Sequence, residues 1–507
     1  SMGRASGRAL GVSSRRVVVV GAGIGGLTAA ALLAYRGYTV RVFDQAQVAG
    51  GCASTFRRRG FIFDVGATQV AGLEPGGIHR QIFDQLGLPL PEATPCDPAC
   101  AVFLPGETEP IRVWRDPAAW QAERQRQFPG SEPFWQLMQR LFQPSWRFQA
   151  RQPVLPPRSP WDLWRLTQAL RPDTLVTVPY TFATVGQVLE QLGLGGDRRL
   201  KIFLDLQLKL YSQVSANETA VLYAATALSM SQAPQGLWHL QGSMQVLSDS
   251  LEKALVRDGG LLQLNHRVQQ VQTDRGRVTG VRVEDQKTGR TWVEPADHVV
   301  ANVTVQNLVQ LLGDTVPQGY QRRVAALPSG SGAFVLYLGV DAAALPADCP
   351  PHLQFFYSYD GPIAENNTLF VSVSRSGDGR APEGRATIVA SSFTDIAPWW
   401  QTRDYEAMKQ AYTDGAIQRL SSYFDLQSDH IIHVEAATPR TFARFTARDQ
   451  GTVGGLGMRV STFGPFGFAN RTPVGGLWLV GDCTHPGEGT AGVSYSAQTV
   501  VKQIEAL

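Results

Sequence analysis

VVVVGAGIGGLTAAALLAYRGYTVRVFD, residues 17–44, is the stretch of this chain that decides its fold. Its first four residues are β-branched and apolar, as in a parallel strand that helices cover on both faces. A glycine turn follows, then a helix rich in Ala and Leu that stops at Gly37, then a strand over residues 39–43 that ends in Asp44. We therefore predict a strand–helix–strand unit with a right-handed crossover.

The glycines of this turn have the spacing of a dinucleotide-binding motif. Gly21 makes the tight turn, Gly23 lets the backbone approach a pyrophosphate, and Gly26 allows the helix to pack closely on the strand. The helix N-terminus offers free amides to the anion. Asp44 follows about 20 residues later, at a strand end where a carboxylate can accept both ribose hydroxyls. The motif predicts that this unit binds a dinucleotide.

A second glycine pair is one of two features that favour FAD over NAD as the cofactor. Gly50 and Gly51 follow the acidic strand directly and precede Ser54 and Thr55. We expect this segment to give another close approach of the backbone to the cofactor.

The C-terminal end of the chain repeats the strand-then-turn pattern. Gly481 and Asp482 follow an apolar strand over residues 477–480, and we expect Asp482 near the ribityl or pyrophosphate region. The next helix can place backbone amides against the flavin ring and stabilise the negative charge of its reduced form. The residues that open this helix are Gly489, Thr490, Ala491 and Gly492. A cofactor held by both ends of the chain must be long, and FAD meets this requirement.

The remaining pattern predicts an α/β protein with two lobes. Amphipathic helical stretches broken by prolines run from about residue 80 to 235, and short alternating stretches typical of hairpin strands begin at Leu261. We expect a Rossmann-like FAD-binding domain built from residues 15–75, 240–315 and 460–507. An interleaved α+β substrate domain would fill residues 76–239 and 316–459, and residues 1–14 would form a mobile basic tail.

Composition excludes several other classes of protein. The chain has 507 residues, 43% hydrophobic and 18% charged, so it is long enough for two or three packed lobes and too apolar for intrinsic disorder. Lys and Arg number 46 against 43 Asp and Glu, a balance that provides no general polyanion-binding surface, so nucleic acid is not an expected partner. The five cysteines form neither a disulfide framework nor a metal-ligand set, which favours a reducing compartment and predicts no metal site.

Three segments resemble the carotenoid desaturase and isomerase family of FAD enzymes. They are residues 19–27, 63–66 and 481–489, and residues 484–487 are the most specific part. Residues 72–79 and 492–497 are most similar to the members that desaturate the 3',4' bond in oxygenic phototrophs. One departure is Asp44, where the family more often has Glu; the shorter side chain reduces the reach to the ribose without changing its chemistry.

The resemblance implies a carotenoid substrate and a desaturation reaction. An acyclic end group would gain a C=C bond, at the 3',4' position, by hydride transfer to flavin N5 and loss of a proton, and a quinone or oxygen would reoxidise the flavin. Two alternatives stay open. One is cis–trans isomerisation of a carotenoid by reduced FAD, and the other is a flavin-containing protein that binds carotenoid without turnover.

The resemblance also places candidate catalytic residues. His485 and Glu488 lie in the loop that would face the flavin, as the base or as residues that shape the loop; the alternative is that both only brace the last helix. His239 is a candidate for contact with substrate or flavin, and a packed, hydrogen-bonded histidine is its alternative. Val268 is assigned from the fold resemblance alone, as a backbone contact to the adenine amine.

Tryptophan and arginine are concentrated in one region. Six of the eleven tryptophans fall between residues 114 and 164, and arginines interleave with the later ones. Such composition is typical of a lipid headgroup boundary, and a carotenoid cannot reach a site through water. We therefore expect the helical part over residues 134–171 to contact membrane lipid, in a peripheral, monotopic protein on the cytoplasmic side. The alternative is an aromatic core with solvated arginines.

Overall fold

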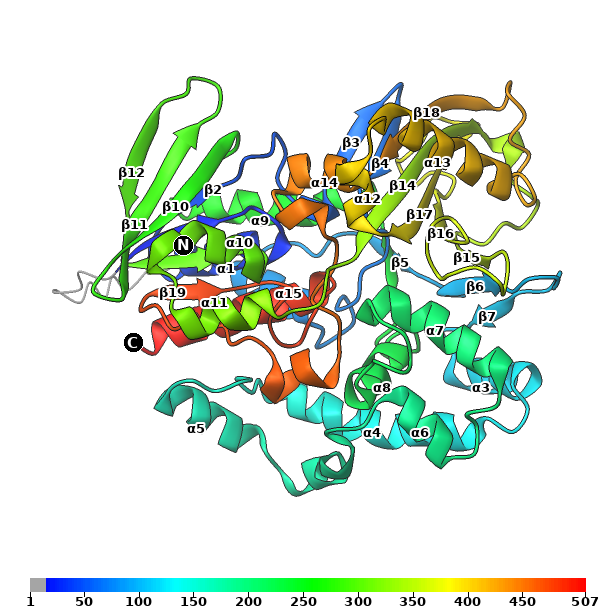
Figure 1. Cartoon of the computed structure of the whole chain (residues 1–507), viewed down its shortest axis with the longest axis horizontal. Helices are drawn as coiled ribbons and strands as arrows, with labels where there is room; N and C mark the ends of the chain where they lie inside the picture. Colours follow the sequence, from blue (N-terminus) through cyan, green and yellow to red (C-terminus); the bar gives the residue numbers. More distant parts are fainter. Residues whose placement is uncertain (1–14) are drawn as a thin grey trace.

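A parallel sheet forms the centre of one lobe in the computed structural model, which describes residues 15–507 (Figure 1). The predicted basic tail, residues 1–14, lies outside the described residues. The sheet has five strands in the order β19-β13-β1-β2-β9, all parallel. Their bounds are β1 Arg16–Val20, β2 Thr39–Phe43, β9 Leu261–Gln263, β13 His298–Ala301 and β19 Leu477–Leu479. The strands come from three separate parts of the chain, all within the ranges expected for the FAD-binding domain.

Both faces of this sheet are covered, and successive side chains of β1 pack into the cores on opposite faces. Val17 and Val19 pack with the helices of one face, and Val18 and Val20 pack with a second sheet and two helices on the other. The first face carries α1 Ile24–Tyr35, α2 Ile78–Leu86, α9 Gln245–Arg257 and α15 Thr490–Glu505. The other carries β10 His266–Asp274, β11 Arg277–Asp285, β12 Thr291–Pro295, α10 Val305–Leu312 and α11 Gln318–Ala325.

The other lobe is built on a seven-stranded sheet in the order β18-β14-β17-β16-β15-β6-β7. Its longest pairing is antiparallel, from Gly332↔Thr394 to Asp341↔Arg385, and only β15 and β6 run parallel among these pairs. The strands are β6 Cys100–Phe103, β7 Ile111–Val113, β14 Gly332–Asp341, β15 His352–Phe356, β16 Thr368–Val373, β17 Arg385–Thr394 and β18 Ile431–Ala437. The helices beside it are α12 Ile396–Gln401, α13 Tyr405–Leu420 and α14 Pro439–Thr446.

A hairpin joins the two lobes. It consists of β3 Thr55–Arg58 and β4 Phe61–Asp64. Phe61 and Phe63 of this hairpin pack on Val335 and Tyr337 of β14, and all four side chains are buried. The first segment of the chain therefore contributes to the core of both lobes.

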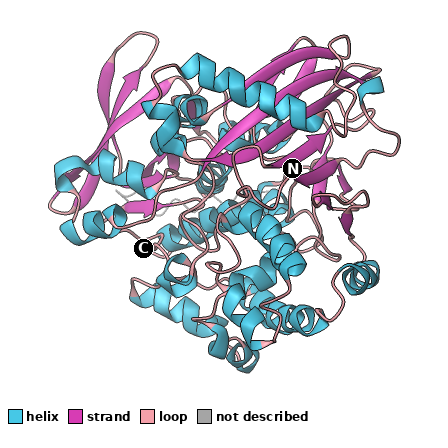
Figure 2. Cartoon of the chain, turned by 45° about the vertical axis from the view of Figure 1, so that its right-hand side comes forward, coloured by secondary structure: helices cyan, strands magenta, loops and turns pink. Residues whose placement is uncertain are grey.

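Helices form the lower part of the molecule in Figure 2, below both sheets. This part contains α3 Pro117–Gln127, α4 Glu132–Ala150, α5 Pro160–Ala169, α6 Val185–Gln191, α7 Arg198–Ser212 and α8 Val221–Ser229. A short antiparallel pair, β5 Ala93–Pro95 and β8 Trp238–Leu240, connects it to the remainder. No helix within residues 15–507 combines the length and apolar character needed to cross a bilayer.

The two-lobed α/β architecture predicted from sequence is confirmed, and two details are wrong. The region expected to be helical contains β6 and β7, which extend the seven-stranded sheet; strands of three or four residues are too short to show a period of two. The stretch at Leu261 is the edge of the parallel sheet, paired with Arg41, and belongs to no hairpin. A short apolar stretch has the same sequence pattern at the edge of a parallel sheet as in a hairpin.

Candidate functional site

A cavity of about 460 Å³ lies between the lobes. On one side, its walls come from the carboxyl ends of β1, β2, β13 and β19 and from the first turns of α1 and α15. On the other side, they come from α7, α14 and strands β14 to β17 of the seven-stranded sheet. Ligands of open parallel sheets bind outside the carboxyl ends of the strands, so the cavity begins where a dinucleotide is expected.

The glycines after β1 allow the backbone to come close to the loop after β13. Gly21 has a φ of +96°, and a Cβ there would lie 2.7 Å from the carbonyl oxygen of Asn302. A Cβ on Gly23 would lie 2.9 Å from Asn302 Nδ2, and one on Gly26 would lie 2.0 Å from the Gly21 carbonyl oxygen. Gly21 and Gly23 line the cavity. Gly26 does not, because its position serves the packing of α1 on β1.

Asp44 lines the cavity at the carboxyl end of β2. Its Oδ2 accepts a hydrogen bond of 2.7 Å from the Ala22 amide, and its Oδ1 accepts one of 2.8 Å from the Ala46 amide. Burial raises the pKa of this carboxyl, an effect that the two amides oppose. Each oxygen has one protein donor and can accept a second hydrogen bond. The carboxylate is therefore held in place with capacity left for two hydroxyls.

Asn302 is a site residue that the sequence reasoning missed. It follows β13, lines the cavity, and contacts the space beside Gly21, Gly23 and Gly26. Its amide donates to the Val20 carbonyl at 2.9 Å, which ties the two strand ends together. The available signal was its position directly after an apolar parallel strand, the same signal that identified Asp44.

The second glycine pair lies against the first. The Gly50 amide donates to the Ala22 carbonyl at 2.8 Å, and Gly50 and Gly51 both line the cavity. Ser54 and Thr55, predicted to contact the cofactor, are not in the wall. The Ser54 hydroxyl donates to the Gly51 carbonyl at 2.7 Å, so it stabilises the turn. The Thr55 amide donates to a side chain of α9 at 3.0 Å as β3 begins.

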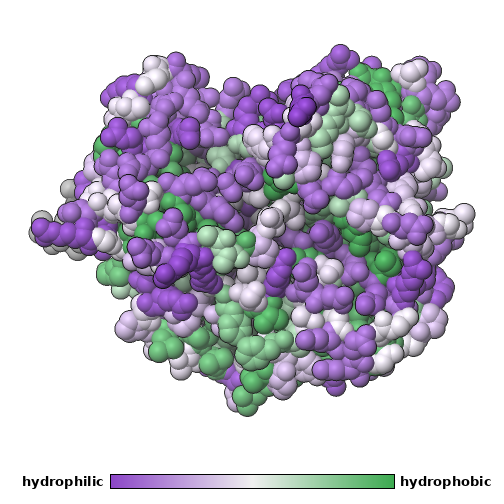
Figure 3. Space-filling model, in the orientation of Figure 1, coloured by the Kyte–Doolittle hydropathy of each residue, from purple (hydrophilic) through white to green (hydrophobic). Residues whose placement is uncertain are grey.

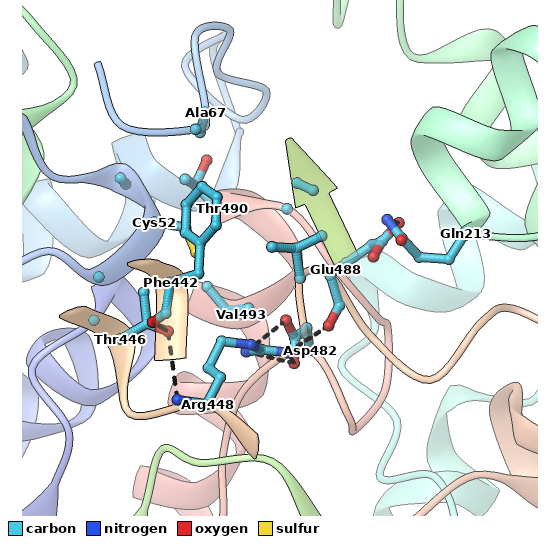
Figure 4. A pocket seen from close by; sticks show the side chains of 18 of the residues that line it. Cys52, Ala67, Gln213, Phe442, Thr446, Arg448, Asp482, Glu488, Thr490 and Val493 are labelled. Atoms are coloured by element: carbon cyan, nitrogen blue, oxygen red, sulfur yellow. Dashed lines mark hydrogen bonds and ion pairs between the residues drawn. The ribbon is translucent and has the colours of Figure 1, made fainter. Parts of the chain in front are cut away.

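The C-terminal segment contributes an ion pair to the cavity wall. Gly481 and Asp482 both line the cavity after β19. Arg448 reaches Asp482 with a separation of 3.1 Å (Figure 4). Its Nε donates to the Thr452 carbonyl at 2.8 Å. Burial opposes the charge of Arg448, but the interactions with its neighbours, led by that with the Asp482 carboxylate, together raise the pKa of the guanidinium. Arg448 was not predicted, because its partner is distant in sequence.

Glu488 is the buried acid of the cavity wall. Its Oε2 accepts a hydrogen bond of 2.8 Å from the Gly455 amide, and its Oε1 accepts one of 3.3 Å from Gln213 Nε2. Figure 4 shows Glu488 beside Asp482, with Gln213 approaching from the opposite side. Burial raises the pKa of Glu488 to about 8. A carboxyl with this pKa can hold or release a proton near neutral pH.

Of the four residues predicted to contact the cofactor at the start of α15, two line the cavity and two do not. Gly489 and Thr490 line the cavity, and Ala491 and Gly492 do not. A Cβ on Gly492 would lie 2.6 Å from the Gly487 carbonyl oxygen, so this glycine lets the helix begin close to the preceding loop.

Two further predicted residues, Val268 and His485, lie outside the cavity wall. Val268 is buried in β10, where it pairs with Val283, and only the fold resemblance had assigned it to the site. His485 Nε2 lies 2.8 Å from Gln149 Oε1, and burial lowers its pKa to about 4. Neither residue lines the cavity, so the backbone contact of Val268 with the adenine amine and the catalytic role of His485 stay predictions.

His239 belongs to a buried ionic cluster, and the alternative of a packed, hydrogen-bonded histidine describes it. Its Nε2 lies 2.9 Å from Asp378 Oδ2. Arg380 Nε lies 2.9 Å from Asp64 Oδ2, and its Nη1 lies 3.4 Å from Asp378. Every member is at least nine-tenths buried. The cluster connects β4 and β8 to the loop between β16 and β17, so it braces one lobe against the other.

The far wall of the cavity is mainly apolar. It is formed by side chains of α7, the seven-stranded sheet and a neighbouring loop: Leu206, Leu210, Val335, Ile363, Phe370 and Phe393. Lys209 is the basic residue of this wall, with its ammonium 5.3 Å from the centre of the Phe393 ring. Burial lowers the pKa of Lys209. The cavity thus joins a polar, glycine-lined part to an apolar part.

Comparison with known proteins gives consistent results. The family described as "Flavin containing amine oxidoreductase" matches residues 24–504. Chloroplastic prolycopene isomerase of Arabidopsis thaliana is 27% identical over 98% of this chain and 83% of its own length. The zeta-carotene-forming phytoene desaturase of Myxococcus xanthus is 26% identical over 97% of this chain and 94% of its own. The crystal structure of an oxidoreductase from Methanosarcina mazei superposes with a TM-score of 0.64 at 17% identity, over 96% of this chain and 100% of its own. At this identity the likeness supports a shared fold and nothing further.

Proposed function

The chain belongs to the flavin containing amine oxidoreductase family and is an FAD-dependent oxidoreductase, and from this premise we propose that it is a carotenoid desaturase. The reaction would introduce a C=C bond, at the 3',4' position, into an acyclic end group. The names of the relatives support a carotenoid as substrate, and the resemblance of residues 72–79 and 492–497 supports the position of the new bond.

The observation that carries this proposal is the continuity of the cavity. It runs from the carboxyl ends of the parallel strands to the apolar wall of the seven-stranded sheet. A hydrocarbon chain offers no hydrogen-bonding groups, so its binding depends on burial against apolar side chains such as Val335, Phe370 and Phe393. An enzyme that oxidises such a chain needs this wall in contact with its cofactor site.

The residues of the polar part fit FAD. The turn at Gly23 and the first amides of α1 would hold the pyrophosphate, because a Cβ at this position would fill the space beside Asn302. Asp44 would accept the ribose hydroxyls with its free lone pairs. The first turn of α15 and Asp482 would hold the flavin end of the molecule. When bound, FAD supplies the two-electron oxidation that a hydrocarbon cannot undergo with amino-acid side chains alone.

Glu488 is the side chain best placed to manage the proton. A carotenoid C–H is not acidic, but the carbon next to an oxidised position loses a proton readily, so a weak base suffices. The Gly455 amide and Gln213 hold the Glu488 carboxylate in the wall. Its raised pKa makes it a better base than an exposed carboxylate, and it becomes active as the pH approaches 8.

Isomerisation is the second candidate, favoured by the similarity to the Arabidopsis prolycopene isomerase. The same cavity would hold a cis carotenoid; the protonated Glu488 would give a proton to the polyene and take a proton back after rotation about the weakened bond. The number of double bonds would then be unchanged.

Two further parts of the proposal concern the electron acceptor and the location of the enzyme. We propose a quinone or oxygen as the acceptor that regenerates the oxidised cofactor. We also propose that the enzyme works as a peripheral protein at the cytoplasmic side of a membrane, because its substrate dissolves in lipid and not in water.

Product analysis tests the proposal. The purified FAD-loaded enzyme is given an acyclic carotenoid in liposomes with a quinone, and products are identified by mass and absorption spectrum. Desaturation predicts a product lighter by two hydrogens whose absorption lies further to the red. A product of unchanged mass with altered isomer composition would contradict desaturation and support isomerisation, and an unchanged carotenoid would contradict both.

A further inference from the structure

Exposed apolar side chains concentrate in one segment of the helical part. Within the described residues, seven of the sixteen most exposed large apolar side chains fall between residues 163 and 182. Leu175 is 69% exposed and Phe182 is 72% exposed. We call this set the lower apolar surface; its residues are Leu163, Trp164, Leu170, Leu175, Val176, Val178 and Phe182. Figure 3 shows apolar residues gathered along the lower edge of the molecule, where Figure 1 places α5 and the chain that follows it.

Within residues 15–507, folding leaves most of the surface of these side chains exposed. Five of them lie on α5 and on two 3₁₀ turns, Pro172–Val176 and Val178–Tyr180, which contain no buried residue; Leu170 and Phe182 lie in the adjoining loops. Exposing this many large apolar groups in water is unfavourable by roughly 25 cal/mol for each Å². Such a concentration marks a surface that binds something.

The charges beside this surface are positive. Its two acids are already neutralised, since Asp162 is paired with Arg471 at 3.0 Å and Asp173 lies 3.3 Å from Arg151. Arg158 and Arg171 are exposed, and their guanidinium groups donate to backbone carbonyls of their own segment, with no ion pair to a carboxylate among residues 15–507. The segment therefore presents apolar side chains together with unneutralised arginines. This combination complements an anionic lipid surface, with apolar groups inserted and guanidinium groups near phosphate.

The lower apolar surface differs from the lipid-contacting part predicted from sequence. That prediction covered residues 134–171 and relied on tryptophans, yet Trp120 and Trp135 are each 3% exposed and pack in the helical core. For these two tryptophans the alternative of an aromatic core is the correct one. Of the six clustered tryptophans, only Trp164 is classed as exposed. The exposed apolar segment begins later and extends past residue 171.

Aromatic contacts link this surface to the cavity. The Phe182 ring lies 5.5 Å from the Phe466 ring, centre to centre. Three residues earlier in the same loop, the Phe463 ring lies 5.7 Å from that of Tyr223, which lines the cavity. One pair thus lies at the lower apolar surface and the other at the cavity wall, and the loop over residues 463–466 connects them.

We propose that the lower apolar surface binds an anionic lipid bilayer and that the loop carrying Phe463 and Phe466 is the route from this bilayer to the cavity. The inference rests on the proposed function for its lipid-soluble substrate. Lipid binding itself depends only on the surface, so the two can fail separately.

Vesicle cosedimentation tests the proposal with the FAD-loaded enzyme. The variant Leu175→Ser/Val178→Ser/Phe182→Ser should bind vesicles of phosphatidylcholine and phosphatidylserine about a hundredfold more weakly than the wild type, since apolar insertion is lost. The matched control Val256→Ser/Leu261→Ser/Val293→Ser removes exposed apolar groups from the lobe of the parallel sheet. This control should bind vesicles as the wild type does. Equal flavin content in all three proteins shows that the fold is intact.

A second variant separates charge from insertion. Arg158→Gln/Arg171→Gln should weaken binding to the anionic vesicles about thirtyfold and leave binding to pure phosphatidylcholine unchanged, because each basic residue near an anionic surface contributes about 1 kcal/mol. Wild-type vesicle binding by the triple serine variant would overturn the proposal. The proposal would also be overturned if the wild type did not bind vesicles and instead formed dimers that the triple serine variant does not form. The surface would then be an interface between two copies of the protein.

Activity distinguishes this inference from the proposed function. The triple serine variant should lose turnover of carotenoid supplied in vesicles and keep turnover of carotenoid supplied in detergent. Loss with both forms, at normal flavin content, would overturn the proposed route. Absence of activity in the wild type with both forms would contradict the proposed function, while the vesicle measurements would still decide the binding surface.

Discussion

Replacing Glu488 with Gln should make the folded enzyme more stable at high pH and leave it unchanged at low pH. The side chain is held by Gly455 and Gln213 in the cavity wall, where burial raises its pKa from 4.5 to about 8. Glutamine keeps the shape and one carbonyl oxygen, so the acceptor of the Gly455 amide is retained. What the substitution removes is the cost of ionising a buried carboxyl.

The size of the effect follows from the two pKa values. Between pH 4.5 and about 8 the folded protein holds a proton on Glu488 that the unfolded chain has released, so the free energy of unfolding falls as the pH rises through this window. One pKa unit corresponds to about 1.4 kcal/mol, which gives a loss of about 5 kcal/mol over the whole window and of about 2 to 3 kcal/mol between about pH 6 and pH 9. The glutamine variant should not show this loss.

Denaturant unfolding of wild type and variant across this pH range is the assay. The difference between their free energies of unfolding should grow with pH up to about pH 8 and then level off. Glu109→Gln is the control, because the Glu109 side chain is 82% exposed and its charge is solvated in both states. A constant difference between Glu488→Gln and wild type at all pH values would refute the reasoning that this carboxyl is protonated at neutral pH.

Three further changes should have distinct effects. Gly23→Val should abolish FAD retention, because a Cβ at this position would lie 2.9 Å from Asn302 Nδ2 and a branched side chain would fill the cradle; a variant that purifies with wild-type flavin content would show the assignment to be wrong. Asp44→Ala should weaken FAD binding by about 1 to 3 kcal/mol in a flavin titration, the loss of charge-assisted hydrogen bonds, and an unchanged affinity would remove Asp44 from the site. Arg380→Met should lower the free energy of unfolding by about 3 to 5 kcal/mol, since Asp64 is left buried without its ion pair and Asp378 keeps only His239, and a loss below about 1 kcal/mol would contradict the brace.

The part of the site that lies on the Rossmann-like unit could be predicted because its signals are local. Gly21, Gly23 and Asp44 occupy fixed places around a strand, a turn and a helix, and the same logic placed Asp482 after the last strand. Asn302 obeys this rule as well, but its strand carries no glycine motif to draw attention to it.

The rest of the site depends on contacts between distant segments. Arg448 reaches Asp482 from the end of α14, and Gln213 reaches Glu488 from the end of α7. No spacing within the sequence announces such pairs, because each partner belongs to a different lobe or helix. His239 shows the reverse: the family resemblance placed it near the expected pocket, and in the structure it belongs to the buried ionic cluster.

Composition also did not show which side chains of the predicted lipid-contacting part lie at the surface. Tryptophans and arginines cluster in the sequence, yet Trp135 turns inward on α4 while the less conspicuous Leu175 is exposed. An amphipathic helix has the same composition whichever neighbour covers its apolar face, so composition alone does not show which side chains remain uncovered.

Anaerobic mixing of the FAD-loaded enzyme with an acyclic carotenoid tests the central claim most directly. Without an external acceptor, the enzyme can oxidise substrate only as far as its own cofactor becomes reduced. We expect the absorbance of oxidised flavin to disappear while one equivalent of a carotenoid lighter by two hydrogens forms for each FAD. A flavin that stays oxidised in the presence of bound carotenoid, or a carotenoid that changes without loss of mass, would contradict it.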